Sequence, residues 1–171
     1  MDDIAAFRPT AVQGVDPSVA EALQILNTVA YVTNQAELAD KGRVPMRARL
    51  VTATTNVIDL NAFAYYENDL APRRRFPLVI KLELKPEFSN NGMCDTSKIP
   101  PLTEDYHNVW IIKIYRVVPV VQESTEEVPR QRGKLQFVRE HNEIADFLAD
   151  YARMAQAHFT TQMRAEDETV S

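Results

Sequence analysis

Cysteine, glycine and histidine are scarce in this chain of 171 residues. Cys94 is the single cysteine, so the chain cannot close a disulfide within itself or build a cysteine-rich zinc site. The three histidines (His107, His141 and His158) are too scattered to suggest metal ligation. No apolar run approaches the roughly 18 residues of a membrane span, and acids stand at the start where a signal peptide has a basic end. We therefore expect a soluble protein of a reducing compartment.

Net positive charge is also lacking, because the formal net charge is −5. Any contact with nucleic acid must then come from a local basic patch, since affinity for phosphates depends on clustered Lys and Arg. Two such patches occur: Lys41 with Arg43, Arg47 and Arg49, and the run Arg73, Arg74 and Arg75. A solvated surface explains such charge clusters equally well.

The pattern of apolar residues predicts an α/β fold. Asp16 before Pro17 is typical of a helix start, and helical spacing extends that helix to about Leu38. The segment 47–55 is apolar and β-branched, which predicts a strand buried on both faces of a parallel sheet. Two further strands are predicted at 78–84 and 109–121, a short one at 135–138, and an amphipathic terminal helix at 142–163.

Polar residues follow the ends of predicted strands, where ligands bind in open α/β sheets. Adjacent acids such as Asp2 and Asp3 can bind magnesium through oxygen, and one of them can orient a water for attack. Asn56, at the end of the Thr54-Thr55-Asn56 run, can polarise a water and contact a phosphate oxygen. Alternatively, the acids cap a helix or a terminus and the asparagine starts a turn.

Two cationic segments complete the pattern. Lys41 before Gly42 at a predicted helix end would project a cation from a mobile tip, although this is also a common helix terminus. Consecutive arginines at 73–75 are costly to bury. Presented at a subunit edge, they would reach the γ-phosphate of a neighbour as arginine fingers.

The order of these features resembles the second half of a viral superfamily 3 RNA helicase. The features are the acidic pair, the Lys-Gly loop, the predicted strand ending TTN and the RRF run. The resemblance is to the replication ATPases of picorna-like viruses and covers residues 1–88, above all RVPMRARLVTATTNVIDLNAFAYYENDLAPRRRFPLVI (43–80). It implies a partial AAA+-like P-loop ATPase core in 1–88, with a parallel sheet and flanking helices. Residues 89–171 would form an extension with strands and a terminal helix.

The resemblance implies a role in ATP hydrolysis for three residues near the predicted strand ends. Asp2 and Asp3 would be the Walker B pair, Asp2 holding Mg²⁺ through water and Asp3 helping to activate the attacking water. Asn56 would be the sensor of the γ-phosphate.

The basic residues receive roles in RNA binding and ring assembly. Lys41, with Arg43 beside it, would contact single-stranded RNA in a central pore. Arg74 and Arg75 would be the fingers lent to the next subunit of a ring oligomer, a hexamer in such helicases, with Arg73 an extra cation. The other expected partners are viral replication proteins, at replication complexes in the host cytoplasm.

One hallmark of such an ATPase is missing. None of the four glycines (Gly14, Gly42, Gly92 and Gly133) stands in a Walker A loop, G-x-x-x-x-G-K-S/T. Only Met1 precedes the acidic pair, so the strand expected before it is missing too. We therefore expect a fragment of a longer polyprotein whose parent hydrolyses ATP while the chain alone does not.

Two other interpretations remain. In the first, the chain is a non-catalytic RNA-binding and oligomerisation module whose terminal helix, 142–163, is the interaction surface. In the second, it belongs to a cellular ATPase or to a replication initiator of a DNA virus. We rank the second interpretation last because of the TTN and RRF segments and the lack of a DNA-binding module.

Overall fold

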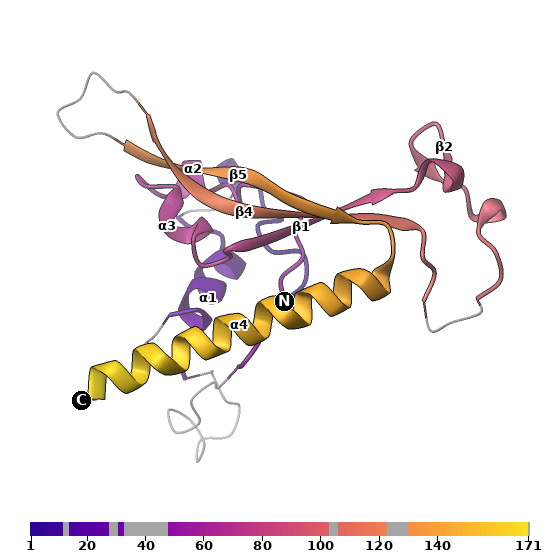
Figure 1. Ribbon diagram of the computed structural model, residues 1–171. Helices are drawn as coiled ribbons and strands as arrows, with labels where there is room; N and C mark the ends of the chain where they lie inside the picture. The colour runs from indigo at the N-terminus through magenta and orange to yellow at the C-terminus, as the bar shows by residue number, and fades with distance from the viewer. Residues whose placement is uncertain (12–13, 28–30, 33–47, 103–105, 123–129, 171) are drawn as a thin grey trace, which may run out of the picture. The chain divides into compact units, whose positions relative to one another are not determined.

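The computed structural model describes residues 1–11, 14–27, 31–32, 48–102, 106–122 and 130–170 (Figure 1). The chain divides into two compact units, one formed by 1–77 with 117–135 and the other by 78–116 with 136–171. The helices and strands in chain order are η1 (Pro9–Ala11), α1 (Pro17–Ile25), α2 (Ala62–Tyr65), α3 (Leu70–Arg73), β1 (Leu78–Leu84), η2 (Pro86–Phe88), β2 (Ser89–Asn90), β3 (Met93–Cys94), η3 (Thr96–Lys98), β4 (Trp110–Gln122), β5 (Arg130–His141) and α4 (Ile144–Val170).

The strands form two antiparallel sheets. One has the order β1-β4-β5, with Leu78 opposite Arg116 and Leu84 opposite Trp110, and the other is the short pair β2-β3. No parallel pair of strands occurs among the residues that the structure describes. The predicted AAA+-like core with its parallel sheet is therefore wrong.

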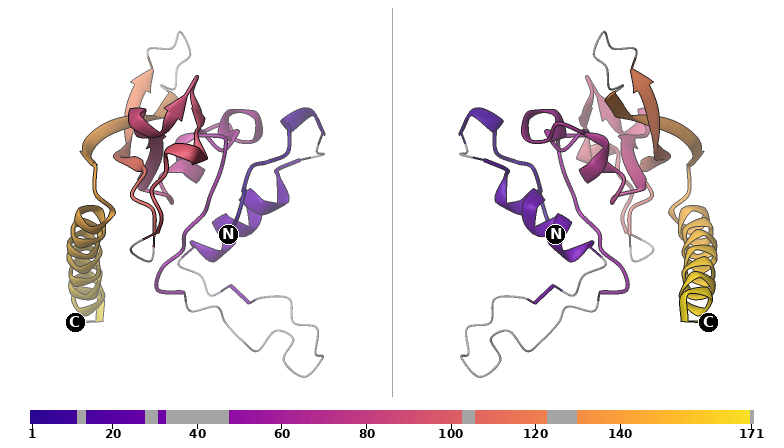
Figure 2. Two further views of the ribbon diagram at one scale, coloured as in Figure 1. Left: turned by 90° about the vertical axis from the view of Figure 1, so that its right-hand side faces the viewer. Right: turned by 90° about the vertical axis from the view of Figure 1, so that its left-hand side faces the viewer.

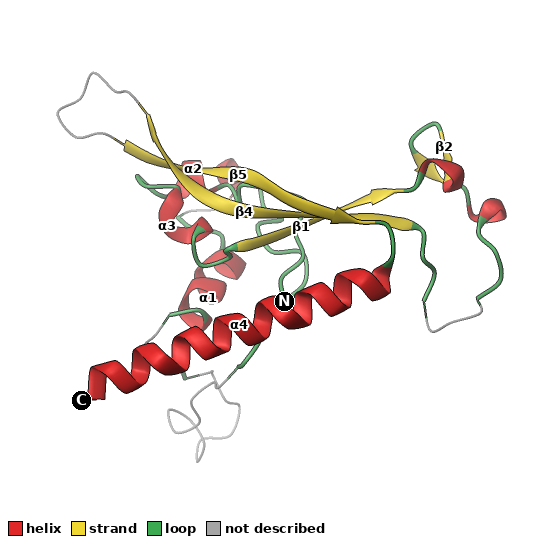
Figure 3. Ribbon diagram, viewed as in Figure 1, coloured by secondary structure: helices red, strands yellow, loops and turns green. Residues whose placement is uncertain are grey.

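The predicted buried strand at 47–55 is also wrong. Residues 48–55 form no strand and are drawn as loop in Figure 3, and the Leu50 side chain is 59% exposed. A β-branched run becomes a strand only where another chain segment completes its hydrogen-bond ladder. Backbone bonds join Thr52 and Thr54 of this segment to residues 1–4, but they do not build a strand.

Helix α1 begins as predicted and ends early. The Asp16 carboxylate accepts a hydrogen bond from the Ser18 N–H at 2.9 Å, and Pro17 occupies the first turn. The helix stops at Ile25, with Leu26 as its C-cap, so it is shorter than the predicted helix to Leu38. The last part of that prediction, 33–38, lies outside the described residues.

The other predicted elements are confirmed. Strand β1 has the predicted bounds, and β4 covers the second apolar stretch. Strand β5 is longer than the predicted 135–138, and α4 extends the predicted terminal helix to Val170. No helix within the described part of the chain combines the length and the apolar character that crossing a membrane would require.

The core of the first unit anchors the segments that carry the polar residues of interest. Ile4 and Ala5 are buried together with Val19 of α1 and Leu60. The partly buried side chains packed against this cluster are those of Val15, Leu23, Ala53, Val57, Tyr66 and Phe76. Buried apolar residues therefore follow Asp2 and Asp3 directly, and partly buried ones lie on both sides of 54–56.

Candidate functional site

The N-terminal residues lie beside the segment 52–54. The Met1 amino group donates to the Thr52 carbonyl at 2.8 Å, and the Thr54 N–H donates to the Met1 carbonyl at 3.1 Å. The Ile4 N–H then donates to the Thr54 carbonyl at 2.8 Å. The two segments run in the same direction over this short contact, which brings the acidic pair next to the Thr-Thr-Asn run.

Four polar side chains meet there, and we call them the Asp3–Asn56 cluster: Asp2, Asp3, Thr54 and Asn56. The Asn56 amide donates to Asp3 Oδ1 at 3.1 Å, joining residues 53 positions apart. The Thr54 hydroxyl accepts from the Asp3 N–H at 2.8 Å and donates to Asp2 Oδ1. All four side chains are exposed to solvent. The cluster is thus an open, acidic, oxygen-rich surface with one amide aimed at a carboxylate.

The backbone beneath the cluster is strained. Asp3 and Ala5 have φ angles of +47° and +61°, in the left-handed region that non-glycine residues seldom adopt. Further hydrogen bonds from side chains help to hold this turn: the Thr55 hydroxyl donates to the Ile4 carbonyl at 2.8 Å, and the Ala5 N–H donates to Ser18 Oγ at 3.1 Å. Strain of this kind costs of order 1–3 kcal/mol and persists only where the surroundings over-determine it.

Asp16 connects this turn to helix α1, which lies beside the N-terminal segment in Figure 2. Its buried carboxylate accepts from the Ser18 N–H and hydroxyl and from the Phe7 N–H at 3.2 Å. Burial alone would raise the pKa of Asp16, but the hydrogen bonds from Ser18, Phe7 and Val19 hold it below its ordinary value. Asp16 is therefore a charged N-cap that also fixes the N-terminal segment.

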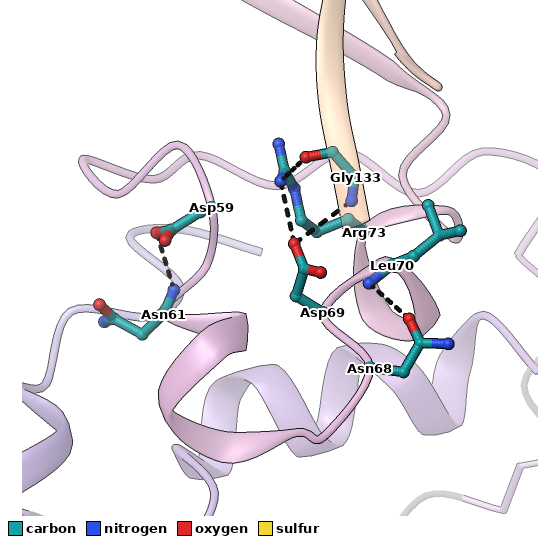
Figure 4. A network of polar contacts seen from close by, with 7 residues as sticks. All are labelled: Asp59, Asn61, Asn68, Asp69, Leu70, Arg73 and Gly133. Atoms are coloured by element: carbon teal, nitrogen blue, oxygen red, sulfur yellow. Dashed lines mark hydrogen bonds and ion pairs between the residues drawn. The ribbon is translucent and has the colours of Figure 1, made fainter. Parts of the chain in front are cut away.

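Arg73, the first of the three arginines, is buried, and Figure 4 shows its polar contacts. Its guanidinium pairs with Asp69 at 3.3 Å and donates to the Gly133 carbonyl, while the Gly133 N–H donates to the same Asp69 carboxylate at 3.3 Å. A Cβ at position 133 would come within 3.2 Å of the Arg73 guanidinium and 3.3 Å of Val117. Glycine is thus the residue that permits this close approach, and Arg73 fastens α3 to β5.

The two predicted fingers differ in their surroundings. Arg74 is exposed, and its side chain makes no hydrogen bond or ion pair within the part of the chain that the structure describes, although its backbone N–H donates to the Leu70 carbonyl at 2.9 Å. Arg75 is half-buried, and its guanidinium donates to Asn27 Oδ1 at 3.1 Å and to the Ala71 carbonyl at 2.7 Å. Both belong to the same unit as the Asp3–Asn56 cluster.

The predicted RNA-binding residues, Lys41 and Arg43, lie outside the described residues, so their placement stays a prediction. Arg47 of the same basic patch also lies outside them, whereas Arg49 is described and exposed.

The Asp3–Asn56 cluster fits one kind of magnesium site, in which the protein supplies only part of the ligands. No group of three or more His, Cys, Asp or Glu side chains that could hold a metal occurs among the described residues. Magnesium usually keeps several waters and takes one or two carboxylates together with substrate phosphates. The exposed carboxylates of Asp2 and Asp3 meet this requirement, but they do not form an all-protein cage.

Sequence reasoning missed several residues that the structure makes important. Thr54 was considered only as part of a strand end, yet its hydroxyl links both aspartates. Asp69 and Gly133 gave no signal of their partnership with Arg73, because the contacts span up to 64 positions.

Asp150 of α4 was missed in the same way. This buried carboxylate accepts from Arg139 at 3.1 Å, lies 3.0 Å from His141 Nε2, and accepts from Arg153 at 3.4 Å. The sequence did contain one indication that Asp150 is buried, because it lies at the edge of the apolar stripe of the terminal helix. Charged residues are seldom buried without partners.

Comparisons of the chain with protein-family models, with curated proteins and with solved structures found no match.

Proposed function

We propose that the chain is part of an ATP-dependent RNA helicase of a positive-strand RNA virus, which works in the host cytoplasm with other viral replication proteins. The observation that carries this proposal is the 3.1 Å contact between the Asp3 carboxylate and the Asn56 amide. The sequence resemblance assigns these two residues to one terminal phosphate, and such an assignment requires them to be neighbours. The proposal concerns the site and not a parallel-sheet core, since function resides in a constellation of side chains.

Each residue of the cluster has a role that its contacts support. Asp2 would bind magnesium through water, and the metal would neutralise charge on the ATP phosphates. Asp3 would orient the attacking water and accept its proton at the carboxylate. Asn56 would contact a phosphate oxygen while holding Asp3 in place, and Thr54 fixes Asp2 relative to Asp3.

The arginines would complete the site of a neighbouring subunit. Such a ring uses heterologous head-to-tail contacts, so each subunit lends a cation to the next. Arg74 is the better placed of the two, because it is exposed, whereas Arg75 would first have to leave Asn27 and Ala71. Lys41 and Arg43 would contact single-stranded RNA.

The proposal requires a P-loop elsewhere in the same protein, because none stands in this sequence. The decisive test therefore uses a longer protein that includes the coding sequence upstream of Met1. We expect Asp3→Asn and Asn56→Ala to lower ATP hydrolysis about 100-fold or more while ATP binding is retained. Glu67→Gln, an exposed carboxylate in the same unit, is the matched control and should hydrolyse normally. Normal turnover in Asp3→Asn would refute the proposal.

A mixing experiment tests the arginine separately. Arg74→Ala and Asp3→Asn should each be inactive, since an arginine finger contributes about three to five decades in rate. In a mixed ring, an Arg74→Ala subunit keeps its own Asp3 and receives Arg74 from an Asp3→Asn neighbour. Mixing should thus restore part of the activity. If assembled mixed rings stay inactive, Arg74 does not act between subunits.

One observation favours the non-catalytic alternative. Helix α4 exposes the apolar side chains of Leu148, Phe159 and Met163, and an exposed apolar stripe is typical of an interaction surface. An RNA-binding and oligomerisation module would bind RNA and assemble unchanged in Asp3→Asn and Asn56→Ala, and the longer protein would show no ATP hydrolysis to lose.

A further inference from the structure

Strand β1 is an edge strand with an uncovered apolar surface. It pairs with β4 on one side, and no described residue pairs with its other edge. Ile80 and Leu82 in the middle of the strand are 42% and 55% exposed. Proteins normally protect such edges, because unpaired backbone groups beside apolar side chains recruit another strand.

The register with β4 shows which backbone groups are available. In an antiparallel pair, alternate residues exchange hydrogen bonds with the partner strand. The Lys85 N–H donates to the Val109 carbonyl, and the Val117 N–H donates to the Pro77 carbonyl. The odd-numbered residues of β1 therefore bond to β4. The N–H and C=O groups of Ile80, Leu82 and Leu84 point away from β4.

The side chains between these residues carry opposite charges. Lys81 lies 3.2 Å from Glu83 on the same strand, and Lys113 of β4 lies 2.6 Å from Glu83. Lys81 is the more exposed of the strand's two charges. The edge therefore presents one cation and one anion two positions apart, between outward-pointing backbone groups.

We propose that the β1 edge binds the β1 edge of a second copy of this chain, antiparallel and centred on Leu82. In this register Leu82 lies opposite Leu82, Ile80 opposite Leu84, and Lys81 opposite Glu83 of the other copy. The outward-pointing residues meet one another, and both Lys81–Glu83 pairs are complementary. The ladder ends where Leu78 meets Pro86, which has no N–H to donate.

The neighbouring registers place like charges opposite each other and are therefore less favourable. A shift by one pair in one direction places Lys81 opposite Lys81, and a shift in the other direction places Glu83 opposite Glu83 and Lys81 opposite Lys85. Like charges directly opposite each other destabilise a sheet, whereas opposite charges stabilise it. Charge therefore selects the Leu82-centred register.

The resulting dimer is weak, because one strand pair buries much less than the roughly 1,600 Å² of a standard interface. Association should accordingly depend on concentration. The proposal does not depend on the proposed ATPase role, since no residue of the Asp3–Asn56 cluster takes part.

Amide hydrogen exchange on the full chain tests the register residue by residue. The N–H groups of Val79, Lys81 and Glu83 bond to β4 and should be protected at every protein concentration. Those of Ile80, Leu82 and Leu84 should exchange quickly in dilute solution and become protected as concentration rises. Protection of all six amides that is independent of concentration would mean that the edge is covered by its own chain and would overturn the proposal.

Charge reversal provides a second test, by sedimentation velocity. Lys81→Glu brings two carboxylates opposite each other in the proposed register, and Glu83→Lys brings two ammonium groups opposite each other. Each variant alone should therefore associate about tenfold more weakly than the natural chain. In an equimolar mixture, the carboxylate introduced in the first variant lies opposite the ammonium group introduced in the second. The unchanged Glu83 of the first variant then lies opposite the unchanged Lys81 of the second, so association should recover.

Controls separate loss of the dimer from loss of the fold. Glu83→Lys removes the partner of Lys113 within its own chain, so unchanged protection of the Val79 and Lys81 amides must confirm that β1 still pairs with β4. Glu87→Lys, an exposed reversal just beyond the strand, should associate as the natural chain does. Failure of the folded mixture to recover association would refute the Leu82-centred register.

Discussion

Different kinds of contact stabilise each of the two units internally. In the first unit, the described residues of 1–77 contribute no strand to the three-stranded sheet, and side chains make several of the contacts between residues far apart in the sequence. Asp3 with Asn56, Ser18 with Ala5 and Arg73 with Gly133 are examples. In the second unit, β1 and β4 share a continuous backbone ladder, with Ile112 and Ile114 buried.

This difference predicts how each unit responds to substitution. A backbone ladder survives the loss of most single side chains, because every residue contributes its own donor and acceptor. A turn held by side chains depends on each of those groups. The first unit should therefore be the more sensitive to single polar substitutions, and its strained turn at Asp3 is the part that most needs such support.

The largest expected effect is that of Arg73→Ala. The substitution leaves the buried Asp69 carboxylate without its cation and the Gly133 carbonyl without its donor. Breaking a buried pair in this way costs about 3 kcal/mol. Urea unfolding measures the loss, and amide exchange should place it in the first unit. Arg74→Ala, at the next position, should change stability by no more than about 0.5 kcal/mol. Equal effects for the two variants would contradict the assignment.

Asp150→Ala tests whether a polar contact can also control the second unit. The buried carboxylate joins α4 to Arg139 and His141 of β5. We expect a loss of about 2 kcal/mol, less than for Arg73→Ala, because the freed guanidinium groups remain in water. Asp146→Ala, which removes an exposed carboxylate one turn earlier on α4, is the control. A larger loss from Asp150→Ala than from Arg73→Ala would reverse the comparison between the units.

Sequence periodicity predicted the second unit better than the first. The alternation over β1 and the helical spacing of the apolar residues of α4 identify a strand and a helix by their periods. This identification holds even though part of each apolar face is exposed, as at Leu82 and Leu148. The prediction of a strand at 47–55 was wrong, and it was based on composition and not on such a period. Its β-branched residues favour a strand, but the sequence of the segment does not show whether another segment pairs with it.

The candidate site was predicted in part. The resemblance implied that Asp3 and Asn56 serve one phosphate, and the structure places these two side chains in contact. Their roles in ATP hydrolysis stay predictions. Three consecutive arginines looked alike in sequence, yet Arg73 is buried and Arg74 is exposed, because only tertiary contacts distinguish neighbours in a short helix.

The smallest expected effect concerns Asp16, and it depends on pH. The pKa of Asp16 is lowered in the folded chain, so the unfolded chain takes up the proton first as pH falls. The stability that the charged N-cap contributes is thus fully present above the unfolded pKa of about 3.9 and is lost as pH falls through the folded value. Asp16→Asn should cost about 1 kcal/mol near neutral pH, because the charge at the helix N-terminus is lost and an amide nitrogen cannot accept the bond from the Phe7 N–H. Urea unfolding from pH 7 down to pH 3 measures the difference.

The difference between the natural chain and Asp16→Asn should then shrink below about pH 4, because protonation removes the charge that the variant already lacks. Asp95 offers a comparison in the second unit, since it also caps a short helix and its pKa is also lowered, by Ser97 first, but it is less buried than Asp16. Asp95→Asn should therefore change stability less at every pH. If Asp95→Asn proved as costly as Asp16→Asn, dependence on single polar side chains would not distinguish the first unit from the second.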